Sequence, residues 1–291
     1  MSNETQYARG YEIGGIEISK SQVRSVVLHL GLYGFAGLFL VPYVWMASTS
    51  IKPEYLIYDS SPHWLTTDVT FEWYRVILFE SPVVSWTIAT FALAAVGTLV
   101  VVLVDSMAAY ALARLEWPGR RIVMGIILAS FMVPAAVNLI PIYAIVSELG
   151  LVNNLLGIIF PYAAGVFGVF MLYQFFKNIP EELEEAARLD GFSTTRIFFR
   201  IAVPMQFPAI AALGLFSFIG LWNSFLWPLI ILQNEAMYTL PIGLVTLETQ
   251  EVTDPGLVMS GAIIASAPLL ILFLAMQDYL FKAVALQGTV K

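Results

Sequence analysis

Cysteine is absent from this chain of 291 residues, and histidine occurs only twice, as His29 and His63. Without cysteine there are no disulfides and no thiol chemistry, and two histidines cannot supply a usual metal cluster. Charge is also scarce, because 12% of the residues are charged, whereas soluble domains average about a quarter. The formal net charge is -7, so the basic surplus typical of nucleic-acid binding is missing.

Hydrophobic residues make up 59% of the chain, and they gather in uncharged runs long enough to cross a bilayer. A membrane span must satisfy its backbone polar groups internally, and these runs are continuous rather than alternating, so we expect helices and not a barrel. The sequence therefore predicts an all-α membrane protein with six transmembrane helices, at 26–46, 86–104, 122–146, 155–176, 208–232 and 257–276. The N-terminal segment lacks the pattern of a removable signal peptide.

The positions of the cationic residues predict the orientation of these spans. Of the 14 Lys and Arg residues, Lys52 and Arg75 alone fall in segments on one predicted side, which leaves 14 − 2 = 12 for the other. Since Lys and Arg accumulate in cytoplasmic loops, both termini are expected in the cytoplasm. The expected organisation is a cytoplasmic tail (1–25), a six-span domain (26–281) with a cytoplasmic loop (177–207), and a C-terminal cytoplasmic tail (282–291).

The most highly charged stretch of the chain, EEAARLDGFSTTRIFFRIAVP at 184–204, lies in this cytoplasmic loop. Pro180 suits the first turn of a helix, and Gly191 suits its end because glycine adopts positive φ at low cost. Ser193 or Thr194 is a candidate N-cap for a second short helix that runs to Pro204. We therefore expect two short helices joined by a glycine elbow.

One face of the first helix carries small residues, because Leu183, Ala186, Ala187 and Asp190 follow i, i+3, i+4, i+7 spacing. Small side chains allow another surface to approach closely. The residues alone leave two interpretations open: a solvated loop helix, or a docking site for a partner.

The order Glu185-Ala186-Ala187, Gly191, Ile201 and Val203-Pro204 resembles the EAA motif of permease subunits in binding-protein-dependent ABC importers, with Val203 where leucine is usual. The resemblance extends over about residues 25–291 and is closest to the maltose-type carbohydrate permeases. Segments that carry it include AYALARLEWPGR (109–120), MVPAAVNLIPIY (132–143), GLVNN (150–154), LWNSFLWPLI (221–230) and YTLPIGL (238–244).

This resemblance implies a type I ABC importer permease fold in the cell membrane and a role as half of a sugar-translocating pore. The implied partners are a second homologous permease subunit, two cytosolic ABC ATPase subunits, an external solute-binding protein, the sugar and the lipid bilayer, with no nucleic acid. The residues that match the coupling motif, and are expected to dock on an ATPase, are Glu184, Glu185, Ala186, Ala187, Asp190 and Gly191. Alternatives are an ABC permease for a non-sugar solute and a stand-alone secondary transporter.

The chain itself lacks the sequence of an ATP-binding phosphate loop, in which Gly-Lys is followed by Ser or Thr. None of its five lysines follows a glycine. We therefore expect no cofactor in this chain, with ATP and Mg²⁺ on the partner ATPase, and we expect a transport subunit rather than an enzyme. No metal site is expected.

Polar and aromatic residues within the spans are candidates for the pore or substrate path. Amides can meet sugar hydroxyls and aromatic faces can meet a pyranose ring, although asparagines also join helices by hydrogen bonds. The candidates are Asn138, Tyr143, Trp222, Asn223 and Trp227. Asp105 is the residue that a proton-coupled secondary transporter would use; its predicted position near the cytoplasmic end of its span, within reach of water or a basic partner, favours a structural role.

Two further features concern the shape of the protein. The external link 233–256 is long enough to touch a docked binding protein, and its candidate contact residues are Tyr238, Pro241 and Glu248. Prolines interrupt the third to sixth spans and predict kinks there, because proline removes a backbone hydrogen bond. They are Pro134, Pro141, Pro161, Pro228 and Pro268.

Overall fold

The computed structural model describes residues 11–13, 16–18, 20–250 and 254–288. Its elements are β1 (Tyr11–Ile13), β2 (Ile16–Ile18), α1 (Lys20–Thr49), α2 (Glu54–Ile57), α3 (Glu72–Phe79), α4 (Val83–Arg114), α5 (Arg120–Ser130), η1 (Ala135–Asn138), α6 (Leu139–Glu148), α7 (Leu155–Tyr162), α8 (Val166–Lys177), α9 (Glu181–Leu189), α10 (Thr194–Ile197), η2 (Phe198–Ala202), α11 (Val203–Met205), α12 (Phe207–Trp222), α13 (Leu226–Ile231), η3 (Glu235–Met237), α14 (Leu240–Gln250) and α15 (Pro255–Gly288).

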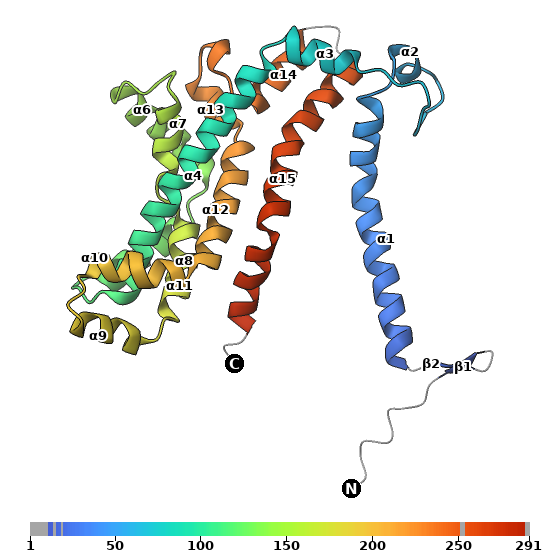
Figure 1. The fold of residues 1–291 in the computed structure, drawn as a ribbon. Helices are drawn as coiled ribbons and strands as arrows, with labels where there is room; N and C mark the ends of the chain where they lie inside the picture. The colour runs from blue at the N-terminus through green and yellow to red at the C-terminus, as the bar shows by residue number, and fades with distance from the viewer. Residues whose placement is uncertain (1–10, 14–15, 19, 251–253, 289–291) are drawn as a thin grey trace.

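Helix α4 is the centre of the fold. It packs along both α8 and α12, and α12 in turn packs on α15 (Figure 1). Helix α1 meets the rest of the protein mainly through α15, and its apolar side chains between Val26 and Val44 are exposed. Since hydrocarbon is the natural solvent for such a surface, α1 is suited to lie in a bilayer.

Among the residues that the structure describes, three helices are long and apolar enough to span a membrane, within α1, α4 and α15. Three further pairs pass the same test but are bent, namely 120–130 with 135–148 by 100°, 155–162 with 166–177 by 47°, and 194–205 with 207–222 by 81°. Counting each bent pair as one span gives six. The predicted all-helical membrane fold is confirmed, and the hairpin β1–β2, paired in antiparallel register from Tyr11↔Ile18 to Ile13↔Ile16, is the one sheet in the described residues.

Several predicted boundaries differ from the structure. Helix α1 already begins at Lys20, and α15 continues to Gly288, because a helix continues past the apolar run that defines the membrane part. The predicted fifth span, 208–232, is not one helix: α12 ends at Trp222 and α13 begins at Leu226. Proline breaks the third span at Pro134, whereas Pro268 lies within the continuous helix α15.

The link 233–256, predicted as an external loop, contains helix α14, which packs between α4 and α15. Trp86 Nε1 on α4 donates a hydrogen bond of 2.8 Å to the Glu235 carbonyl, and Leu240 N donates one of 2.7 Å to Thr90 Oγ1. Leu240 is fully buried. The sequence analysis missed this helix because its apolar segment is too short to count as a span.

Gly243 on α14 lies directly against the indole ring of Trp86, so that a Cβ at this position would overlap three ring atoms. Trp86 is itself fully buried, and the ring cannot move aside without disturbing α4. We therefore expect Gly243→Ala to destabilise the protein by about 1–3 kcal/mol, the usual cost of overpacking. Thermal unfolding of the purified protein in detergent measures this effect.

The matched control is Gly125→Ala on α5, where a Cβ would meet nothing within 4 Å. Alanine is favoured over glycine inside a helix, so this variant should unfold at or above the temperature of the parent protein. Equal unfolding temperatures for the two variants would contradict the close packing of α14 on α4.

Candidate functional site at the α9 end

The end of the molecule that carries α9, called the α9 end below, has an elbow formed by α9, Gly191 and α10 (Figure 1). Pro180 precedes α9 in extended conformation (ψ 132°), and acidic residues occupy the first turn, where the helix dipole favours negative charge. Ser193 caps α10, because its Oγ accepts a hydrogen bond of 3.4 Å from Arg196 N. The start of each helix is therefore set by residues of its own first turn and the residue before it.

Gly191 ends α9 with φ +80°. Its N–H donates to the Arg188 carbonyl at 3.0 Å, and the N–H of Phe192 donates to the Ala187 carbonyl at 2.9 Å. These two bonds form the Schellman arrangement, which satisfies carbonyls at a helix end and requires a left-handed residue. The elbow therefore has a defined shape, set by one glycine.

A buried ion pair fastens α9 to the end of α4. Arg114, the last residue of α4, donates from Nε to Glu184 Oε1 at 3.0 Å, and the two side chains are only 7% and 4% exposed. Glu181 lies further from the guanidinium, with 3.9 Å between its Oε1 and Arg114 Nη1, and is 82% exposed. A buried charge that loses its partner is costly, so this pair holds α9 in place.

A cluster of aromatic side chains packs against the elbow. The ring of Tyr110 on α4 lies 5.7 Å from that of Phe176 on α8 and 5.2 Å from that of Phe198, between ring centroids. Ala187 and Ile197 are buried in the same cluster. Phe198 begins a π-helical segment, Phe198–Ala202; π segments are frequent at functional sites. The elbow is thus packed on the membrane helices and does not extend freely from them.

The structure divides the predicted coupling residues into two groups. Glu185, Ala186, Asp190 and Gly191 are exposed, whereas Glu184 and Ala187 are buried against the protein's own helices. Ala187 and Glu184 are therefore covered by the protein's own helices, and the role of the six residues in ATPase docking stays a prediction. Both side chains face α4 and α8, because α9 is fixed to the protein by burying one of its faces against these helices.

Leu189 is the exposed residue that the sequence analysis missed. It is 90% exposed at the last position of α9, next to Glu185 and Ala186 on the outward side. Its spacing of four residues from Glu185 and three from Ala186 places it on their helix face. Leu189 therefore gives the outward face of α9 an apolar side chain that a partner could cover.

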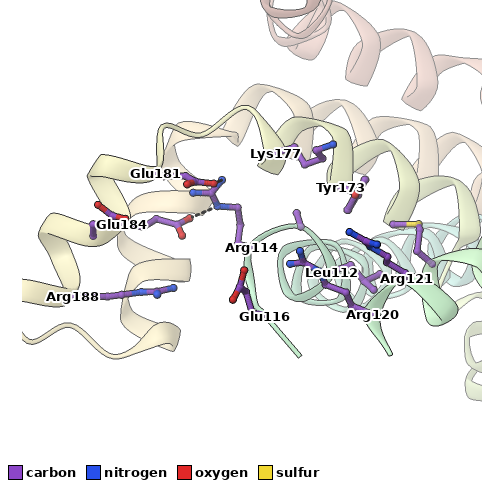
Figure 2. A pocket seen from close by; sticks show the side chains of 13 residues that line it. Leu112, Arg114, Glu116, Arg120, Arg121, Tyr173, Lys177, Glu181, Glu184 and Arg188 are labelled. Atoms are coloured by element: carbon purple, nitrogen blue, oxygen red, sulfur yellow. Dashed lines mark hydrogen bonds and ion pairs between the residues drawn. The ribbon is translucent and has the colours of Figure 1, made fainter. Parts of the chain in front are cut away.

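A cavity of about 650 Å³ lies between α9 and the ends of α4, α5 and α8. Figure 2 shows Arg114 pointing from one wall toward Glu184 and Glu181, while Tyr173 and Lys177 lie on the other wall. The charged lining residues are Arg114, Glu116, Arg120, Arg121, Lys177, Glu181, Glu184, Glu185 and Arg188. In the part of the chain that the structure describes, no group of three or more acidic or histidine residues could hold a metal ion.

Two of the predicted pore residues are buried in helix packing instead. Trp222 is 1% exposed, and its Nε1 donates to the Ala265 carbonyl on α15 at 3.0 Å. Trp227 is 4% exposed, and its Nε1 donates to the Gly157 carbonyl at 3.2 Å. Neither ring presents a face to an open path in this conformation, and their role as substrate contacts stays a prediction.

The other pore candidates remain nearer the surface. Asn223 is exposed, and its Nδ2 donates to the Ile219 carbonyl of its own helix at 2.9 Å. Asn138 and Tyr143 are half-buried near the bend of the third span. Asp105, expected within reach of water or a basic partner, is instead fully buried, and its Oδ1 accepts a hydrogen bond from the backbone N–H of Gly165.

The residues expected to face a binding protein lie at the opposite end from α9. Tyr238 follows η3 and is half-buried, Pro241 is half-buried in the first turn of α14, and Glu248 is exposed on the same helix. η3 and α14 bring them to the same end of the molecule.

Comparisons with known proteins agree with this geometry. Residues 102–286 match the family described as binding-protein-dependent transport system inner membrane component. The chain is 32% identical to the probable ABC transporter permease protein YurM of Bacillus subtilis (strain 168) over 92% of this chain and 88% of that one. It is 36% identical to the lactose transport system permease protein LacG of Rhizobium radiobacter over 68% and 72% of the two chains.

A third relative is the diacetylchitobiose uptake system permease protein NgcG of Streptomyces coelicolor (strain ATCC BAA-471 / A3(2) / M145), 30% identical over 91% of this chain and 88% of that one. Among solved structures, a chain of a bacterial ABC transporter involved in the import of the acidic polysaccharide alginate superposes with a TM-score of 0.79 and 25% identity. The match covers 91% of this chain and 99% of that chain.

Proposed function

Because this chain belongs to the family of binding-protein-dependent transport system inner membrane components, we propose that it forms half of a saccharide pore with a second, homologous permease chain. It is a multi-pass protein of the inner membrane and a transport subunit. A system of this family works with an ATPase and a binding protein. Two ATPase subunits, one beneath each permease chain, complete the proposed assembly.

The proposal of a saccharide rests on the relatives, whose names specify lactose, trehalose, arabinooligosaccharides and diacetylchitobiose. All four are neutral carbohydrates of two or more units. The solute of this chain is therefore expected to be a saccharide, delivered by the external binding protein.

The elbow at the α9 end is the observation that carries the coupling role. Its outward face presents Glu185, Ala186 and Leu189, and its inward face is fixed to α4 through Glu184 and Arg114. An ATPase that grips the outward face would move α4 with it, since the ion pair transmits the displacement. ATP and Mg²⁺ would be bound by that ATPase, with this chain contributing the docking surface.

Reconstitution in proteoliposomes tests the function. The chain is assembled with a permease, an ATPase and a binding protein encoded by neighbouring genes, and uptake of radiolabelled lactose, trehalose and diacetylchitobiose is measured. Uptake of at least one sugar should require two additions: ATP on the side of the membrane where the ATPase lies, and the binding protein on the opposite side. ATP-independent, proton-driven uptake by this chain alone would contradict the proposal and favour a secondary transporter.

Leu189→Ser tests the docking surface. If Leu189 fills an apolar pocket on the ATPase, its loss should weaken ATPase binding about 30-fold, because an interface anchor contributes about 2 kcal/mol or more. Titration of the purified ATPase subunit onto the permease chains in nanodiscs measures the Kd.

The matched control is Leu65→Ser, since Leu65 is 82% exposed in the segment between α2 and α3, away from the α9 end. This variant should bind the ATPase as the parent chain does. An unchanged Kd for Leu189→Ser would show that the outward face of α9 is not the anchor.

A further inference from the structure

A buried lysine near the outer end of α1 has no anionic partner. Helix α1 ends at Thr49, at the end of the molecule opposite α9 (Figure 1), and Lys52, which follows it, is 2% exposed. Its Nζ lies 4.3 Å from the centroid of the Trp45 ring. Among the described residues this Nζ forms neither an ion pair nor a hydrogen bond. Buried lysines are almost always paired, because a buried charge without a partner is costly.

The surroundings of Lys52 are fixed by packing. Trp73 Nε1 on α3 donates a hydrogen bond of 2.7 Å to the Lys52 carbonyl. The Trp45 ring, over which the ammonium group lies, meets the Trp64 ring edge to face, with the centroids 5.0 Å apart. These contacts hold both the backbone of Lys52 and the ring beneath its ammonium group, so the charge is kept at this position without an anion.

Lys52 lines a cavity of about 220 Å³ between the end of α1, α2 and the segment that follows α2. The ammonium group is open to this cavity. The buried polar atoms that lack both a partner and accessible surface include Thr49 Oγ1, on the same wall, but not Lys52 Nζ. The cavity therefore presents a cation to whatever enters it.

The acidic residue that lines this cavity, Asp59, is engaged by other groups. Its Oδ2 lies 2.7 Å from His63 Nε2, and its Oδ1 accepts hydrogen bonds of 3.3 Å from Ser61 N and Ser60 Oγ. Neither oxygen lies within ion-pair distance of Lys52 Nζ. The charge of Lys52 is therefore left for an anion from outside the described chain.

The depth of the cavity matches the headgroup layer of a bilayer. Exposed apolar side chains of α1 run from Val26 to Val44, about 27 Å of helix rise, which is close to the hydrocarbon thickness of about 30 Å. The helix continues from Val44 to Thr49, about 7.5 Å further, into a headgroup layer of about 5–8 Å on each side. Aromatic residues are enriched at this level. Those exposed near the cavity are Tyr55, Tyr58 and Trp64.

We propose that this cavity binds the phosphate group of a phospholipid in the leaflet at this end of the protein, where Lys52 Nζ donates hydrogen bonds to the phosphate oxygens and the acyl chains lie along α1. An ammonium group is a donor only, and a phosphate accepts through several oxygens. Phosphatidylglycerol fits better than a zwitterionic lipid, because choline or ethanolamine would bring a second cation beside Lys52. The bound lipid supplies the missing anion and anchors the end of α1 at the membrane surface.

Lipid titration of the delipidated full-length chain in a neutral detergent tests the site, with bound phosphatidylglycerol counted by native mass spectrometry. Lys52→Met keeps an unbranched side chain beside Trp45 and removes the charge, so it should raise the Kd of the tightest-bound lipid about tenfold or more. An unchanged Kd in this variant would overturn the proposal.

The matched control is Arg75→Met. Arg75 is the other cation predicted on this side of the membrane, but it is exposed and already paired with Glu72 and Glu80. Its replacement should change the Kd less than about twofold, because exposed ion pairs contribute little. A loss of affinity as large as that of Lys52→Met would show a general effect of charge and remove the site.

Three ligands distinguish the sources of the phosphate. Phosphatidylglycerol should bind at least about tenfold more tightly than diacylglycerol with the same acyl chains, which has no phosphate. Glycerol 3-phosphate in molar excess should not displace the lipid, since it lacks the acyl chains that lie along α1. Equal binding of diacylglycerol would show that the phosphate is not recognised, and displacement by glycerol 3-phosphate would assign the site to a soluble phosphate ester. Either result contradicts the lipid site.

Thermal unfolding separates lipid binding from a purely structural role of Lys52. Phosphatidylglycerol should raise the unfolding temperature of the parent chain by mass action, and that of Lys52→Met much less. Without lipid, Lys52→Met should unfold at or above the temperature of the parent, since an unpaired buried charge is removed. A lower temperature without lipid, together with an unchanged effect of lipid, would show that Lys52 only stabilises the fold. Weaker capture of the external binding protein at unchanged lipid affinity would assign Lys52 to that partner and end the lipid proposal.

Discussion

Replacing Arg114 with methionine is expected to release α9 from the protein and to reduce ATP-driven uptake to less than about a tenth of the parent value. The substitution keeps an unbranched, flexible side chain, although a shorter one, and removes the charge that faces Glu184. Glu184 is 3% exposed, so its carboxylate would remain buried without a cation. Removing one partner of a buried pair costs about 3–5 kcal/mol, and α9 can avoid this cost by detaching.

Amide hydrogen exchange reports the detachment directly. The amides of α9 (Glu181–Leu189) should exchange about 100-fold faster in Arg114→Met, because local opening is favoured by the lost free energy. ATP hydrolysis by the partner should continue while uptake stops, since the connection from ATPase to α4 is broken.

Two further variants decide whether the charge pair itself is responsible. The double variant Arg114→Met/Glu184→Leu removes both charges and should recover most of the slow exchange, because an apolar pair can replace a buried ion pair. Glu181→Gln removes the exposed carboxylate at 3.9 Å from Arg114 Nη1 and should have little effect. Fast exchange in the double variant, or slow exchange in Arg114→Met, would contradict the role of the pair.

Gly191→Pro is expected to abolish coupling between ATP hydrolysis and uptake, with membrane insertion unaffected. Proline fixes φ near −65° and has no N–H, whereas Gly191 has φ +80° and donates to the Arg188 carbonyl. The end of α9 and the start of α10 therefore cannot keep their present directions. A loss of about 3 kcal/mol is expected for the elbow, and uptake should fall more than tenfold.

Gly191→Asn is the matched control, since asparagine tolerates the left-handed conformation and keeps the N–H. A Cβ at this position would meet nothing within 4 Å, so crowding is excluded as a cause. The asparagine variant should retain at least about half of the uptake, measured with ATP hydrolysis in the same vesicles. Normal uptake in Gly191→Pro would refute the assigned role of the elbow.

The elbow was predictable from the sequence because its signals are local. Pro180, Gly191 and Ser193 each restrict their own backbone or that of close neighbours, and the structure places a helix start, a left-handed residue and a helix cap at these positions. The all-helical membrane fold was predictable for a similar reason, since long uncharged runs can satisfy their backbone in lipid only as helices.

The inward and outward faces of α9 were not predictable, because they depend on a residue 70 positions away. Arg114 and Glu184 become a pair only when α4 ends beside α9. The same holds for Trp222 and Trp227, whose indole N–H groups find carbonyls on α15 and α7. A sequence pattern can identify an aromatic residue as a candidate substrate contact, but it does not predict which helix will pack over the ring.

The apolar runs and the turn residues by themselves determined that this protein is a bundle of membrane helices with a charged elbow. The free energy of forming a membrane helix, and that of forming a turn, depend on residues within about twenty positions of one another in the sequence. Tertiary structure alone decided that α14 folds back against α4, that Leu189 faces outward, and that Asp105 is enclosed beside the break of α7 and α8. These outcomes depend on which distant side chains come into contact. Burial and ion pairing stabilise such contacts between residues far apart in the sequence, so the local sequence does not predict them.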